Sequence, residues 1–105
     1  MRNYCADCTI KHLSKALILS NELRWYPSHI YLIIGNLSEA EDEVCQHYPA
    51  LADQIRAARL QLMPMAKYCS MDGLPGTAWD EIVMVFNDVD LQALVEDVGE
   101  LLHAE

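Results

Sequence analysis

Three residues near the start of the chain have side chains that bind zinc, and their spacing would let them bind it together. Cys5, Cys8 and His12 form the pattern C-x2-C-x3-H. On a helix of 3.6 residues per turn, these side chains fall within one narrow sector. Thiolates and imidazoles are typical zinc ligands. The spacing therefore predicts a three-ligand face that suits zinc.

A second helix that folds back on the first would bring a fourth ligand to this face. With a turn between the helices near residue 27, position i lies across from about position 53 − i. Cys8 then lies across from Cys45, and His12 lies across from Glu41, with His47 at the same end.

We expect Cys45 to be the fourth ligand, because three thiolates and one imidazole make a closed, structural zinc site. Glu41 and His47 are the alternatives. Either of them would let a water molecule share the metal, which would allow Lewis-acid chemistry.

Two other interpretations of the same cysteines stay open. Cysteine is often buried and behaves as a small hydrophobic side chain, so these residues would also suit a plain core. A redox-active C-x2-C pair is the third interpretation, although such pairs accompany a βαβ pattern that this sequence lacks. Cys69 has no predicted role.

Charged residues in the second and third expected helices form the other candidate site. Arg56 and Arg59 could bind an anion such as a nucleotide phosphate, but pairing with the acidic second helix is the commoner outcome. The acidic run at residues 39–43, which includes Glu41, is expected to lie mostly on a solvated outer face.

Hydrophobic residues recur at helical spacing, which predicts an all-α fold. The expected helices cover residues 5–25, 29–47, 49–63, 78–86 and 89–103, with a loop over 64–77. Pro64 ends the third helix, and residues 72–76 are rich in turn formers. Residues 82–86 are β-branched and apolar, so a buried strand is the alternative there.

Several residues are expected to begin these helices. Ser28 would cap the second helix, and Pro49 suits the first turn of the third. Thr77 with Asp80 resembles a capping box, and Asn87 or Asp88 would cap the last helix.

The length of 105 residues fits one helical domain. We expect an antiparallel helical hairpin extended to a small four- to five-helix bundle. Residues 1–63 would form a three-helix N-terminal part, and residues 78–105 would hold the C-terminal helices.

The formal net charge is −9, from 16 acidic and 7 basic residues. This excess opposes direct binding to nucleic acid or to anionic membranes, and it suits a basic protein partner. The sequence has no secretory signal and no apolar run of about 18 residues, so we expect a cytoplasmic protein. It has no phosphate-binding glycine loop, serine nucleophile elbow or HExxH motif, which disfavours an enzyme.

Residues 5–13, CADCTIKHL, and residues 35–43, GNLSEAEDE, resemble small helical proteins of bacteriophage type. Their pattern is CxxCxxKHL followed by GHLxEAExE, and Asn36 stands where that pattern has His. The resemblance covers the N-terminal part of the chain, up to about Met63. It implies a phage or prophage origin, a compact helical hairpin and a bacterial host cell, but no activity. Proteins of that setting often act by binding host machinery, which favours an interaction protein.

We therefore expect a small acidic binding or adaptor protein whose N-terminal hairpin is pinned by a structural zinc. The alternatives are an acidic inhibitor that mimics nucleic acid or blocks a basic groove, and an oligomeric nucleotide binder near Arg56 and Arg59. A metal-dependent hydrolase with Glu41 as base is a further alternative. The apolar stripe of the last helix would also suit a homo-oligomer.

Overall fold

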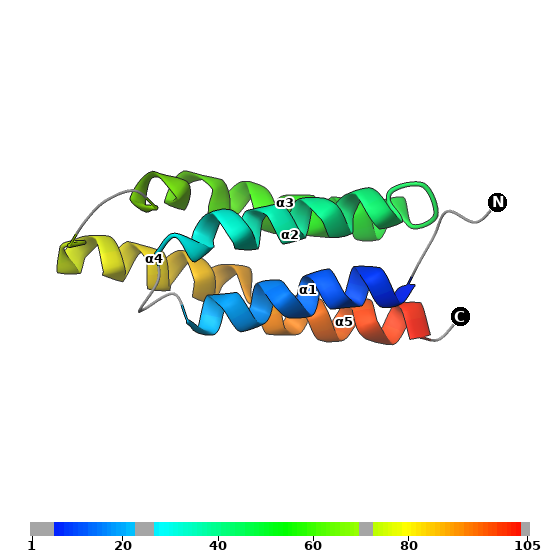
Figure 1. The fold of residues 1–105 in the computed structure, drawn as a ribbon. Helices are drawn as coiled ribbons and strands as arrows, with labels where there is room; N and C mark the ends of the chain where they lie inside the picture. Colours follow the sequence, from blue (N-terminus) through cyan, green and yellow to red (C-terminus); the bar gives the residue numbers. More distant parts are fainter. Residues whose placement is uncertain (1–5, 23–26, 70–72, 104–105) are drawn as a thin grey trace.

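Apolar residues at helical spacing form helices along most of the chain. The structure is a computed structural model that describes residues 6–22, 27–69 and 73–103. In order, these residues form α1 (Ala6–Asn21), α2 (His29–Val44), α3 (Pro49–Leu62), the 3-10 helix η1 (Met63–Tyr68), α4 (Gly76–Val89) and α5 (Leu91–His103). The predicted all-α bundle is confirmed (Figure 1).

The N-terminal half is the predicted antiparallel hairpin of α1 and α2, with α3 packed on α2 (Figure 1). Leu13 of α1, Ile33 and Leu37 of α2, and Ile55 of α3 belong to one core and expose at most 1% of their surface. Burying each such side chain contributes about 1.5–3 kcal/mol. The three helices are therefore held by a shared apolar core.

The C-terminal helices extend this core along the long axis of the molecule. α4 packs on α3, and α5 packs on α1 and α3. The two helices follow one another, so the molecule is elongated, with extents of 48 × 23 × 19 Å (Figure 1). The first turn of α1 and the last turn of α5 lie at the same end. No helix in the described ranges is long and apolar enough to cross a membrane.

Of two predictions about the middle of the chain, one was wrong and one is confirmed. Residues 63–68, most of which were expected to lie in a loop, form η1. Pro64 sits in the first turn of η1, where its missing N–H is not needed. The helix predicted over residues 78–86 is confirmed as part of α4, so the alternative of a strand at residues 82–86 is wrong. Ile82 is buried while Val83 and Met84 are exposed, so helical packing outweighs the local β-propensity.

The predicted helix starts were partly right. Pro49 does occupy the first turn of α3. Ser28 makes no side-chain capping bond to α2. The capping box at Thr77 was wrong, because α4 already begins at Gly76 and Pro75 takes the N-cap position.

The start of α5 is capped by Asp90, which is later in the chain than the two residues predicted. The Ala93 amide donates to Asp90 Oδ1 at 3.1 Å, which is the usual N-cap bond. Asp90 has φ 52°, in the left-handed region, and its amide donates to the Phe86 carbonyl at 3.1 Å. One residue therefore ends α4 and begins α5, because short polar side chains tolerate this conformation.

Candidate functional site

The predicted zinc ligands belong to the end of the molecule where α1 begins and α2 ends. Cys5 lies outside the described residues. Cys8 is disulfide-bonded, whereas Cys45 and Cys69 are free thiols. Within residues 6–22, 27–69 and 73–103, no three His, Cys, Asp or Glu residues are grouped so that they could hold a metal ion. A zinc site here requires the reduced thiol of Cys8 and a rearrangement of its neighbours.

His12 faces α2, as expected, but its partner there is Glu43 and not Glu41. His12 Nδ1 lies 3.0 Å from Glu43 Oε1. The predicted pairing matched positions by their distance from the turn. It did not include the direction in which each side chain points around the helix axis. Residues two apart on a helix point about 200° apart, so α2 turns Glu43 toward α1 and Glu41 toward α3.

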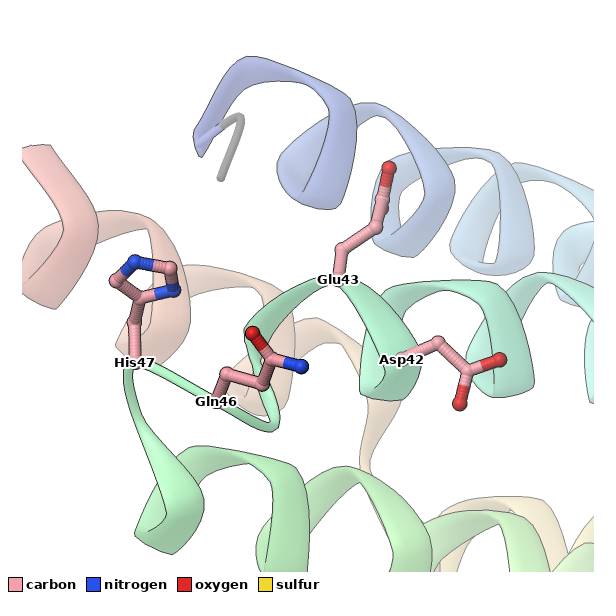
Figure 2. Close-up of a pocket in the computed structure, with 4 residues that line it drawn as sticks. All are labelled: Asp42, Glu43, Gln46 and His47. Carbon is pink, nitrogen blue, oxygen red and sulfur yellow. The ribbon is translucent and has the colours of Figure 1, made fainter. Parts of the chain in front are cut away.

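The other two candidate ligands are exposed residues in the turn after α2. The Cys45 thiol donates to the Asp42 carbonyl oxygen at 3.3 Å. His47 lines a polar hollow of about 330 Å³ with Asp42, Glu43 and Gln46. Figure 2 shows that the Glu43 side chain points toward α1, whereas Asp42 points away from it. The hollow is thus polar, but its carboxylates do not converge.

Glu41 is buried, although its acidic segment was expected to lie outside. Its carboxylate accepts hydrogen bonds from Arg56 Nε at 2.8 Å and from Arg59 Nη2 at 3.0 Å and Nε at 3.2 Å. Burial alone would raise the pKa of Glu41, but these bonds and the positive charges lower it below its ordinary value. Glu41 is therefore a charged link between α2 and α3 and not a free base.

The same bonds determine what Arg56 and Arg59 can do. Pairing with the acidic second helix was the commoner outcome expected, and the structure shows it. An anion would have to compete with the buried Glu41 carboxylate for both guanidinium groups. The Glu41 hydrogen bond and charge also raise the pKa of Arg56. Through Glu41, these two arginines hold α3 against α2.

A second hollow, which was not predicted from the sequence, lies where α1 ends and α4 meets α5. Its volume is about 460 Å³. We call it the junction hollow. Residues that line it are Leu17, Ser20 and Asn21 of α1 with Phe86, Asp90 and Leu91 of the α4–α5 junction. The only local signal was Asp90, a residue type that favours helix caps and turns.

Basic and acidic residues are distributed unevenly along the chain, which the net charge of −9 does not show. All seven basic residues lie within residues 1–67, where seven acidic residues balance them. The nine remaining acidic residues lie in residues 68–105, without any Lys or Arg. Counting charge by segment would have found this signal in the sequence.

The helices α4 and α5 carry this charge on exposed positions, and we call them the acidic helix pair. Their exposed acidic residues are Asp80, Asp88, Asp90, Glu96, Asp97 and Glu100. Large apolar side chains are exposed beside them: Val83 by 53%, Met84 by 62% and Leu101 by 48%. Exposed apolar residues with a charged surround are typical of binding surfaces.

Comparisons with protein families, with curated proteins and with solved structures found no match to this chain.

Proposed function

We propose that this chain is a protein-binding module whose acidic helix pair docks on a basic surface of a partner protein. The separation of charge carries the proposal: residues 68–105 hold nine acidic and no basic residues. A surface of one sign attracts a partner of the opposite sign and disfavours wrong partners by repulsion.

The exposed apolar residues of α4 support a docking role over a merely solvating one. Val83 and Met84 expose more than half of their surface on a helix whose only fully buried side chains are Ala78 and Ile82. Docking would remove this apolar area from water, which contributes affinity, while the acidic residues supply orientation and association rate.

A cationic amphipathic helical peptide, with Arg and Lys on one face and Leu on the other, tests this proposal. The test variant Glu96→Gln/Asp97→Asn/Glu100→Gln removes three charges from α5. The matched control Glu39→Gln/Asp42→Asn/Asp53→Asn removes three exposed charges from the balanced part of the chain.

We expect the α5 variant to bind the peptide roughly tenfold more weakly, and the control to change affinity less than about threefold. Affinity should fall as salt rises, because exposed charges are screened. Equal losses in both variants would show that net charge alone attracts the peptide, and would reject the acidic helix pair as the binding surface.

The acidic inhibitor predicted from the sequence is a special case of this proposal, in which the partner's basic surface is a nucleic-acid groove. DNA would then compete with the chain for that partner. The predicted zinc concerns residues of the α1–α2 hairpin and not of the acidic helix pair, so the binding surface proposed here does not depend on it.

A further inference from the structure

The junction hollow combines an apolar base with a rim of hydrogen-bond acceptors. Leu91 exposes only 4% of its surface, and Leu17 and Phe86 are half-buried beside it. Phe86 contributes an aromatic side chain to the lining. Around these lie the amide side chains of Asn21 and Gln92. Such a site suits a ligand group with an apolar stem and a polar head.

The electrostatics of the junction hollow favour a cation. Among the residues that the structure describes, Asp90 is the one charged residue that lines the hollow, and no described Lys or Arg lines it. α1 ends at Asn21 and α4 ends at Val89, so two helix C-termini lie at this place. The last carbonyl groups of a helix carry partial negative charge.

The N-terminus of α5 also lies here, and its partial positive charge opposes the negative potential of the two C-termini. The negative charge of Asp90 compensates for it. Its Oδ1 already accepts the Ala93 amide at 3.1 Å. A carboxylate has two oxygens with about four acceptor positions, so the cap leaves acceptor capacity on Asp90. Gln92 donates its amide Nε2 to Glu96 at 3.2 Å, which leaves its carbonyl oxygen as a further acceptor.

We propose that the junction hollow is the anchor site for an arginine side chain of the basic partner, which rests on the proposed function. The methylene stem would lie on Leu17 and Leu91, and the guanidinium would meet Asp90 and the helix carbonyls. Arginine fits better than lysine because its planar group offers five donors and stacks on aromatic rings such as Phe86.

The variant Asp90→Asn tests this site with little disturbance of the fold. Asparagine caps helices about as well as aspartate and tolerates the left-handed conformation, so only the charge is lost. Asp42→Asn removes the same charge at an exposed position of α2, outside the acidic helix pair and away from the lining of the hollow. Equal melting temperatures of the two variants would confirm the match.

The probe is N-acetylarginine amide, titrated into the labelled protein and followed by NMR, with N-acetyllysine amide as comparison. We expect amide shifts centred on Ser20, Gln92 and their neighbours, and weaker shifts with the lysine probe. Binding should be roughly fivefold weaker in Asp90→Asn and nearly unchanged in Asp42→Asn. Shifts spread over the acidic helix pair, or shifts unaffected by Asp90→Asn, would overturn the anchor site.

Failure of the anchor site and failure of the proposed function give different results. In one outcome, the α5 triple variant binds the cationic peptide more weakly while the arginine probe does not bind in the junction hollow. In that case only the anchor site is wrong. If the peptide shows no preference for the acidic helix pair, the proposed function fails, whatever the arginine probe does.

Discussion

At the scale of single residues, the same acidic type has different roles depending on what its side chain faces. Glu41 and Glu43 lie two positions apart in α2, yet Glu41 faces two arginines of α3 and Glu43 faces His12 of α1. Glu41 is the one acidic residue among those described as buried. Its hydrogen bonds compensate for the cost of burying a charge.

Replacing Glu41 by Gln should lower the free energy of unfolding by about 1–3 kcal/mol at neutral pH, because two charge-assisted contacts are lost. The pKa of Glu41 is lower in the folded than in the unfolded chain. The ion pairs therefore contribute fully above the ordinary glutamate pKa, and this contribution disappears as pH falls through the lowered folded-state pKa.

Denaturant unfolding at a series of pH values checks this prediction. The difference between wild type and Glu41→Gln should shrink on acidification, whereas the exposed control Glu39→Gln should stay within about 0.5 kcal/mol of wild type. A difference that is constant with pH would show that Glu41 acts by its shape and not by its charge.

The two free thiols should differ in reactivity. Cys45 is exposed after α2, whereas Cys69 is half-buried beside η1, and burial raises the pKa of the Cys69 thiol although a Tyr31 backbone hydrogen bond opposes this. The thiolate is the reactive form, so Cys45 should react with a thiol reagent at least several times faster. Mass spectrometry of the alkylated protein over time measures both rates. Faster labelling of Cys69 would contradict the packing around η1.

At the scale of elements, α4 forms the predicted helix although part of its sequence favours a strand. Residues 82–86 have the composition of a buried strand, but α4 buries Ile82 and exposes the two residues after it. An alternating strand would instead place residues 82 and 84 on one face and residue 83 on the other. The burial of single residues therefore distinguishes the two structures.

Ile82→Ala should destabilise the fold by about 2–4 kcal/mol, because it removes a side chain that is 2% exposed. Val83→Ala and Met84→Ala should each change stability by no more than about 0.5 kcal/mol, because both residues are exposed. Thermal or denaturant unfolding of the three variants measures these changes in stability. A large cost at Met84 would indicate that residues 82 and 84 share a buried face.

The sequence predicted the helices well because apolar spacing reports directly which face of a helix is buried. It predicted the ends less well, since capping at Asp90 and the 3-10 turn at Pro64 depend on how neighbouring helices meet. It placed His12 toward α2 but chose the wrong glutamate. The rotation of α2 that decides between Glu41 and Glu43 is set by packing on both α1 and α3, which a pairwise hairpin count cannot include.

At the scale of the whole molecule, the α1–α2 hairpin and the acidic helix pair carry different chemistry. The α1–α2 end holds Cys8, His12, Glu43 and His47, while the charge excess belongs to the acidic helix pair. Tyr68 and Lys67 of η1 both contact Glu81 of α4, and so connect the balanced part of the chain to the acidic one. The molecule thus combines a hairpin in which Cys8 is disulfide-bonded with a strongly acidic pair of helices.

The zinc hypothesis makes a prediction about this hairpin that a disulfide alone does not. In the reduced protein, one equivalent of zinc should raise the melting temperature by several degrees, because metal binding adds directly to folding free energy. Cys8→Ser should abolish the increase, whereas Cys69→Ser should keep it. If reduction lowers the melting temperature and zinc does not restore it, the disulfide at Cys8 and not a metal stabilises the start of α1. Elemental analysis of the reduced protein gives the stoichiometry, and native mass spectrometry gives the oligomeric state in the same experiment.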